Sequence, residues 1–440
     1  MMPNIDKSLE MQRRGRALIP GMTQLLSKRP DMFSLGVWPG YYSRAKGVTV
    51  WDLDGNEYID MSISAIGASI LGYADPDVDG AVIDAIRSGV VSSLNCPEEV
   101  ELAELLCDLH PWAQMVRFTR SGGEAMAVAV RIARAHTGRD RVAFCGYHGW
   151  HDWYLAANVG ADNALGEHLI PGLDPCGVPR CLEGTALPFR FNRVEELKSI
   201  VEEHRSDLAA IILEPVRNDD PTSDFVAAVR EMADHVGAVL IVDEISSGFR
   251  LNSGGAHLIY GYKPDMAVFS KAMGNGYPIG AIIGKAPVME SAQRSFISST
   301  CWTERTGPVA ALATISKHRA LDVSRHLCKV GKMVQDGWRD ILSDLSLSGH
   351  VSGMYPMSHV DFDGPFARHM KAFFVQEMLD KGFLASNLFY ASLAHNENHV
   401  SSYLSAARDV FAKMKRHLEE GTIEKALNGQ PSQVGFKRLN

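Results

Sequence analysis

Residues 238–244 read AVLIVDE and residues 266–271 read MAVFSK, two short apolar runs that end on charged side chains. Four further runs have the same form: VRFT (116–119), RVAFCG (141–146), AAIILEP (209–215) and AIIGK (281–285). Helical patterns lie between some of them, at 121–138 and 223–237, and each ends near a glycine that could cap it. This alternation is typical of βαβ units, so we predict a large α/β domain with a mainly parallel sheet.

The segments outside this core indicate a second, smaller domain. VTVWDLDGNEYIDM (48–61) predicts a hairpin around Asp54-Gly55-Asn56, and such a hairpin needs a partner for its apolar face. Beyond the core, a long helical pattern from about 316 to 345 is followed by HVDFD and by helical patterns near 367–381 and 396–418. We expect residues 1–65 and 316–440 to form the small domain, residues 66–315 to form the large one, and the last dozen residues to be a loosely attached tail.

Composition excludes several functional classes. The 440 residues contain 44 Lys+Arg and 52 Asp+Glu, a net charge of −8, and no basic block favours nucleic acid as a partner. The seven cysteines form no CxxC pair, which favours a reducing compartment over a disulfide framework. No apolar leader or run of about 18 apolar residues is present, so we expect a cytoplasmic protein without a membrane partner.

Charged, polar and glycine residues follow the predicted strands, at the sheet edge where α/β proteins bind ligands. They are Ser121-Gly122-Gly123, Tyr147-His148, Glu214, Asp243 and Lys271. A Gly-rich turn that opens a helix can cradle a phosphate, although such a turn is more often only a helix cap. Burial would lower the pKa of Lys271, although a lysine at a strand end is commonly a surface residue. Taken singly, Asp243 could be a helix cap and Tyr147 could be core packing.

Together these groups meet the needs of pyridoxal 5′-phosphate (PLP): an anion cradle, a stacking ring, an acidic partner for the ring nitrogen and an amine. The order SGGEA, YHGWHD, EP, DEISSGFR, SKAMGNGYPIG resembles class III aminotransferases, in particular the glutamate-1-semialdehyde 2,1-aminomutase branch. WDLDGNEYIDM, LGYADPDV (71–78) and EVELAELL (99–106) extend the resemblance to roughly residues 15–410. It implies PLP-dependent transferase fold type I, with a seven-stranded, mainly parallel sheet and a smaller α+β domain.

The resemblance also implies roles for single residues. Lys271 matches the lysine that forms the Schiff base with PLP, and Asp243 matches the aspartate at the pyridine nitrogen. Tyr147 matches the aromatic residue that stacks on the cofactor, followed by His148 as in the family, and Glu214 matches a residue on the O3′ side.

Two further matches concern the phosphate. Ser121, Gly122 and Gly123 fall on the family's phosphate turn, where Gly123 replaces a common hydroxyl residue and so leaves more of the binding to backbone N–H groups. Thr300, with Thr303 as the competing choice, matches a threonine that reaches the phosphate of a neighbouring subunit, which implies a homodimer with shared sites.

The substrate side departs from the mutase branch. Lys28, with Arg29 beside it, stands where that branch has an arginine for the substrate carboxylate. Trp38, Tyr41 and Trp150 suit a larger hydroxylated substrate such as a sugar derivative, unless they are interface packing. His148 and His151 lack a third ligand at matching spacing, so we expect no metal site.

We therefore predict a PLP-dependent aminotransferase that moves an amino group from an amino donor to an aldehyde or keto acceptor. A glutamate-1-semialdehyde 2,1-aminomutase, or a related racemase or epimerase, is the alternative on the same site. A non-catalytic binding protein on this fold is a remote alternative, because both the lysine and the acidic ring partner are present.

Overall fold

The computed structural model describes residues 3–161, 163–168 and 171–435. The chain forms two compact units, one built from residues 1–75 with 326–440 and the other from residues 76–325. Within the described ranges, no helix is both long and apolar enough to cross a membrane.

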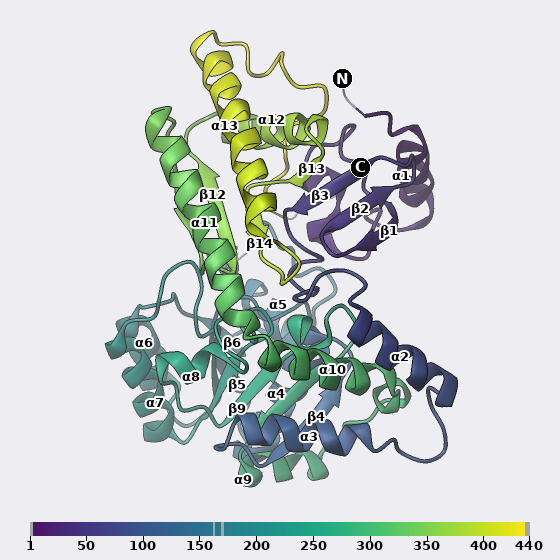
Figure 1. Ribbon diagram of the computed structural model, residues 1–440. Coiled ribbons are helices and arrows are strands. Elements are labelled where there is room, and N and C mark those ends of the chain that lie inside the picture. The colour runs from purple at the N-terminus through teal and green to yellow at the C-terminus, as the bar shows by residue number, and fades with distance from the viewer. Residues whose placement is uncertain (1–2, 162, 169–170, 436–440) are drawn as a thin grey trace. The chain divides into compact units, whose positions relative to one another are not determined.

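The larger unit is built on the predicted seven-stranded sheet, of which β4, β5, β6 and β9 are labelled in Figure 1. Its strand order is β4-β10-β9-β8-β7-β5-β6. Its strands are β4 (Met115–Thr119), β5 (Arg141–Cys145), β6 (Ala186–Pro188), β7 (Leu208–Leu213), β8 (Val239–Asp243), β9 (Met266–Phe269) and β10 (Gly280–Gly284). Neighbours from β9 to β6 pair in parallel, whereas β10 pairs antiparallel with both β9 and β4. The mainly parallel architecture is confirmed.

Six strands coincide with the six apolar runs of the sequence. The exception is β6, which has only three residues, pairs with β5 at the sheet edge, and ends on Pro188. A run this short carries no periodic signal, and proline is tolerated there because an edge strand has one side without ladder bonds.

Alternating residues of each central strand face two separate cores. Ala210 and Ile212 of β7 pack in a cluster with α4 (Gly122–Thr137), whereas Ile211 and Leu213 pack in a cluster with α7 (Ser223–Val236). The side-chain period of two along a strand produces this division. Because both faces are covered, the strands are apolar throughout.

Both predicted helices begin and end where their sequences indicate. The hydroxyl of Thr222 accepts a bond from Phe225 N at 3.2 Å at the start of α7. Gly138 after α4 and Gly237 after α7 adopt left-handed φ angles of 70° and 67°, which glycine accommodates without strain.

The smaller unit contains the predicted hairpin, β2 (Thr49–Asp52) with β3 (Glu57–Met61). Its partners are β1 (Tyr42–Lys46) and the C-terminal strand β13 (Phe383–Ala385), in the order β1-β2-β3-β13. A second sheet, β11-β12-β14, contains β11 (Gly349–Ser352), β12 (Met357–Phe362) and β14 (Leu388–Tyr390). HVDFD falls mostly in β12.

The helical pattern at 316–345 is two helices and not one. α10 (Thr306–Ala320) ends before Asp322, whose φ of 46° breaks the helix, and α11 (Val323–Asp344) follows. α11 lies beside α13 (Glu397–Glu419), where Trp338 Nε1 donates to Tyr403 Oη at 3.1 Å (Figure 1).

The described part of the tail is attached, contrary to expectation. Gln430 N donates to Leu35 O at 2.9 Å, Gln433 N donates to Asp31 O at 2.8 Å, and Ser432 is buried. Residues 436–440 of the predicted tail lie outside the described residues.

The remaining described helices are α1 (Asp6–Leu18), α2 (Pro76–Ser88), α3 (Glu98–Leu109), α5 (Asp152–Leu155), α6 (Val194–Glu203), α8 (Ala256–Tyr260), α9 (Ala286–Met289) and α12 (Ala367–Asp380). Short 3₁₀ turns are η1 (Leu26–Lys28), η2 (Pro30–Met32), η3 (Ala156–Asn158), η4 (Arg180–Leu182), η5 (Lys271–Gly274), η6 (Glu290–Arg294) and η7 (Thr300–Thr303).

Candidate active site

Five parallel strands place the predicted residues at one edge of the large sheet. Ser121 follows β4, Tyr147 and His148 follow β5, Glu214 follows β7, Asp243 ends β8, and Lys271 follows β9. Hydrogen bonds join His148 to Asp243 and Tyr147 to Glu214.

Asp243 and His148 form a buried pair. Nδ1 of His148 donates to Oδ2 of Asp243 at 2.8 Å, and the two residues are 2% and 1% exposed. The second carboxylate oxygen accepts from Ile245 N at 3.0 Å. Both oxygens are thus held, so the carboxylate has a fixed orientation. His148, predicted to bind the cofactor, is the hydrogen-bond partner of Asp243.

Lys271 has a strained backbone and a hydrogen-bonded amine. Its φ of 43° is in the left-handed region, which a non-glycine side chain adopts at a cost of about 1–2 kcal/mol. Nζ donates to Oγ of Ser246 at 2.8 Å. Burial lowers the pKa of the amine, as predicted; the charge of Arg250 lowers it further, and Glu214 and Asp243 oppose the change.

Glu214 and Tyr147 are held together at the ends of β7 and β5. Oε2 of Glu214 accepts from Tyr147 N at 3.0 Å and lies 3.2 Å from Nη1 of Arg217. Gly146 has a φ of 124°, and a Cβ there would lie 2.6 Å from Glu214 Oε2, so only glycine fits. Burial, with the charges of Asp243 and Glu214, raises the pKa of Tyr147.

Gly122 and Gly123 are the first two residues of α4. The Glu124 carboxylate accepts from Ser121 N at 3.0 Å, while Gly122 and Gly123 provide N–H groups of the first helical turn, which have no helical carbonyl partner. A Cβ on Gly122 would lie 2.9 Å from Cδ1 of Ile245. Gly122 and Gly123 thus form a cradle, and a side chain at either position would occupy the space in it.

A histidine and a tryptophan occupy the space beside Gly123. A Cβ there would lie 3.2 Å from Nδ1 of His151 and 3.5 Å from Nε1 of Trp150, and the two rings stack with centroids 4.3 Å apart. Nδ1 of His151 is buried and has no hydrogen-bond partner within the described chain, and burial lowers the pKa of this histidine. An orphaned nitrogen, free N–H groups and a helix N-terminus fit a phosphate.

Thr300 and Thr303 lie in η7 and are exposed, with Thr303 Oγ1 donating to Thr300 O at 3.0 Å. Arg120, which precedes the glycine turn, donates to Glu304 O, and its Nε lies 3.7 Å from Glu304 Oε2. These contacts attach the threonine segment to the large unit and do not distinguish between the two hydroxyls.

The predicted substrate residues Lys28, Trp38 and Tyr41 belong to the smaller unit. Lys28 is exposed, whereas its neighbour Arg29 is 5% exposed and bonded to both carboxylate oxygens of Asp31, with Nε to Oδ1 at 3.0 Å. Trp38 is buried, and its ring stacks on Phe33 at 3.9 Å, which is ordinary core packing.

Tyr41 and Trp150 differ from Trp38 in their surroundings. Tyr41 is partly exposed, and its hydroxyl would be 2.5 Å from a Cβ at Gly15. Trp150, in the larger unit, is 69% exposed.

Ser246 and Arg250 also act on Lys271, but the sequence patterns do not predict this. Both lie in DEISSGFR, a segment in which the end of a strand marks only Asp243. The turns that bring Ser246 and Arg250 back to Lys271 have no periodic pattern in the sequence. Arg250 is fully buried, and its Nε donates to Ser246 O at 3.1 Å.

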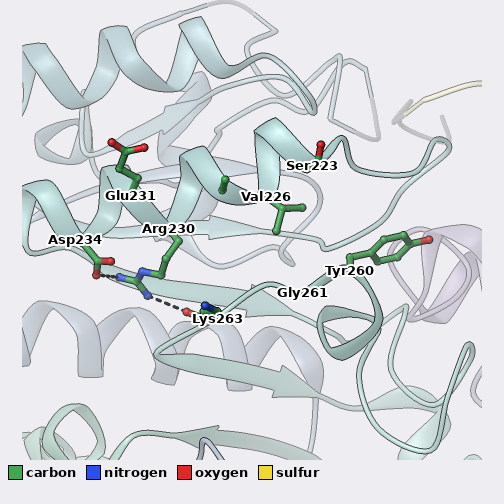
Figure 2. Close-up of a pocket in the computed structure, with 9 residues that line it drawn as sticks. Ser223, Val226, Arg230, Glu231, Asp234, Tyr260, Gly261 and Lys263 are labelled. Carbon is green, nitrogen blue, oxygen red and sulfur yellow. Dashed lines mark hydrogen bonds and ion pairs between the residues drawn. The ribbon is translucent and has the colours of Figure 1, made fainter.

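A surface groove of about 530 Å³ lies elsewhere, along α7 and the residues after α8 (Figure 2). Nη2 of Arg230 binds Asp234 at 2.7 Å, and its Nη1 binds Lys263 O and Asp265, each at 3.0 Å. Because this cation is neutralised and no predicted site residue lines the groove, the groove is not the active site.

Comparison with known proteins now identifies the family. The model of the class III aminotransferase family matches residues 36–392. The chain belongs to the class III aminotransferases. These enzymes use PLP, which is therefore the cofactor of this chain, and Lys271, Asp243 and the glycine turn present the groups that it requires.

Curated relatives in this family have different activities. The chain is 31% identical to 3-aminobutyryl-CoA aminotransferase of Cloacimonas acidaminovorans (94% of this chain, 99% of the relative). It is 32% identical to glutamate-1-semialdehyde 2,1-aminomutase of Methanothermobacter thermautotrophicus (93% and 100%). It is 33% identical to 2′-deamino-2′-hydroxyneamine transaminase of Streptomyces kanamyceticus (76% and 80%).

The fold matches that of a protein of known structure. FumI of Sphingopyxis sp. MTA144, solved in its PLP internal aldimine form, superimposes with a TM-score of 0.86 at 22% identity, over 97% of this chain and 98% of FumI. The predicted type I fold is confirmed.

Proposed function

We propose that this class III aminotransferase binds PLP through Lys271 and transfers an amino group from an amino donor to an aldehyde or keto acceptor. The observation that carries the proposal is the half-buried Lys271 amine, bonded to Ser246 Oγ at 2.8 Å, at the same sheet edge as the Asp243–His148 pair and the glycine turn. Packing of the fold alone does not require an amine, an oriented carboxylate and an anion cradle at one place. PLP-dependent amino transfer needs all three groups.

Asp243 and Lys271 divide the proton chemistry. When bound, PLP withdraws electrons from the substrate carbon that loses its proton. The Asp243 carboxylate, held by His148 and Ile245 N, would keep a proton on the ring nitrogen. The Lys271 amine would move a proton between the substrate Cα and C4′ of the cofactor, and its lowered pKa increases the fraction in the basic form.

The remaining residues would hold the cofactor. We assign Ser121, Gly122 and Gly123 to the phosphate, Tyr147 to a ring face, and Glu214 to the O3′ side. His148 would act through Asp243 and not directly on the ring.

A homodimer with shared sites is part of the proposal. Thr300 or Thr303, both exposed, would supply a hydroxyl to the phosphate of the neighbouring subunit. A cytoplasmic location is supported by the absence of disulfides among the seven cysteines, all of which are free.

A hydroxylated carbonyl compound is the acceptor class that we favour. The Arg29 guanidinium, the one arginine beside Lys28, is bonded to Asp31, so it is not available as a two-point fork for a substrate carboxylate. One relative supports this acceptor class. The name of the 2′-deamino-2′-hydroxyneamine transaminase of Streptomyces kanamyceticus describes the amination of a hydroxylated compound. The mutase is the second candidate, favoured by 32% identity over 431 residues.

Spectra of the half-reaction separate the two. With an amino donor alone, a transaminase releases a keto product and accumulates aminated cofactor in stoichiometric amounts. A mutase converts its substrate without releasing a keto product. We expect the first result, and a screen of donors with product identification by mass spectrometry measures it.

A further inference from the structure

We propose that Ser246 is a further positioning residue of the reaction: its hydroxyl holds the Lys271 amine in place for proton transfer. This inference rests on the proposed function, because it assigns a partner to the amine that carries the cofactor. Its evidence is a contact in this chain and a comparison of the other acceptors nearby.

Ser246 is the acceptor that the described chain offers to this amine. The Nζ to Oγ distance of 2.8 Å is that of a well-formed hydrogen bond. Asp243 accepts from His148 and Ile245 N, and Glu214 accepts from Tyr147 N and pairs with Arg217. Both oxygens of Asp243 and Oε2 of Glu214 thus have other donors, and the Ser246 hydroxyl accepts the bond from the amine.

The turn that carries Ser246 is held at several points. Gly248 N donates to Glu244 O at 2.8 Å, and Arg250 Nε donates to Ser246 O at 3.1 Å. Ser247 Oγ donates to Glu244 Oε2 at 2.6 Å, and Glu244 in turn accepts from His257 Nδ1 at 2.7 Å. Ser246 therefore offers its hydroxyl from a backbone that does not move freely.

A hydroxyl suits an amine that must both take up and release a proton. It can accept from the ammonium or the neutral amine and can donate to the neutral amine, so it holds both forms. A carboxylate in this place would stabilise the ammonium and work against the base, whereas an alkyl group would leave a flexible four-carbon chain unrestrained. Arg250 is buried on the same turn, and its charge further disfavours the ammonium form of Lys271.

The test compares Ser246→Ala, Ser246→Thr and, as a matched control, Ser199→Ala, which removes the hydroxyl of an exposed serine on α6. First, PLP-free protein is labelled with an amine-reactive reagent across a pH range, and modification of Lys271 is followed by peptide mass spectrometry. Ser246→Ala should move the midpoint to lower pH by about one unit, because the ammonium loses a charge-assisted acceptor. Ser246→Thr and Ser199→Ala should leave the midpoint in place.

Kinetics of the loaded enzymes provide the second readout. Ser246→Ala should lower kcat about tenfold with little change in KM for the donor, because an unrestrained amine is misplaced for proton transfer. Ser246→Thr should restore most of kcat. An unchanged midpoint and unchanged kcat in Ser246→Ala would overturn the inference while leaving the aminotransferase intact, whereas a wild-type protein without PLP on Lys271 would overturn the proposed function itself.

Discussion

The buried Asp243 carboxylate accepts a hydrogen bond from His148 Nδ1 at 2.8 Å, and this pair joins the ends of β8 and β5. The strands are separated by β7 in the sheet, so the pair bridges one strand. A carboxylate bonded through both oxygens in this way has a fixed orientation.

Replacing Asp243 with asparagine should slow turnover about 10²-fold or more and leave the fold intact. The amide keeps the shape but cannot hold the ring proton electrostatically. Steady-state kcat, measured beside thermal unfolding and PLP content, tests this. Turnover near the wild-type value in a stable variant would show that the ring nitrogen has another partner.

Gly122→Ala should weaken PLP retention about tenfold. The new methyl group would stand 2.9 Å from Ile245 Cδ1 at the turn assigned to the phosphate, so either the Ile245 side chain or the turn must move. Gly138→Ala, at the other end of α4, is the control: its φ of 70° strains the backbone, but nothing lies within 4 Å. We expect it to lose thermal stability and to keep its PLP affinity, measured by equilibrium dialysis; equal PLP affinities for the two variants would refute the assignment.

Mixing two inactive variants should restore activity if sites are shared between subunits. Lys271→Ala removes the amine from its own site, and Thr300→Ala removes a hydroxyl from the neighbouring site. A mixed dimer therefore has one doubly damaged site and one intact site. Activity should rise after subunit exchange, and Thr303→Ala in place of Thr300→Ala determines which hydroxyl acts. If neither mixture recovers and a folded monomer is fully active, the shared site is wrong.

Arg29→Ala should lower the free energy of unfolding by about 3 kcal/mol with little change in KM for a carboxylate donor. The substitution leaves Asp31, 4% exposed, without the guanidinium that neutralises it. Exposed Lys28, replaced by alanine, should leave stability unchanged. Chemical denaturation and steady-state kinetics measure both effects, and a large rise in KM with unchanged stability in Arg29→Ala would assign this arginine to the substrate and restore the mutase.

Much of this structure could be predicted from local patterns, and the failures have physical causes. Apolar runs reveal strands buried on both faces, but β6 is too short for a run. The helix break at Asp322 has no glycine or proline to mark it, since aspartate tolerates left-handed φ. Tail residues such as Ser432 are polar, and their attachment depends on partners some 400 positions away.

The residues of the site likewise fall into two groups, those that a local sequence pattern marks and those that no pattern marks. Lys271 and Asp243 end strands, so their meeting at one sheet edge follows from topology. The bond from Lys271 to Ser246 and the pairing of Arg29 with Asp31 depend on side-chain directions in turns, which no periodicity encodes.

The attachment point of PLP tests the central claim most directly. Reduction of the purified enzyme with borohydride, followed by peptide mapping, locates the lysine that carries the cofactor. The account predicts one phosphopyridoxyl mark, on Lys271, with none on the Lys271→Ala variant. A mark on a different lysine, or none after incubation with PLP, would contradict it.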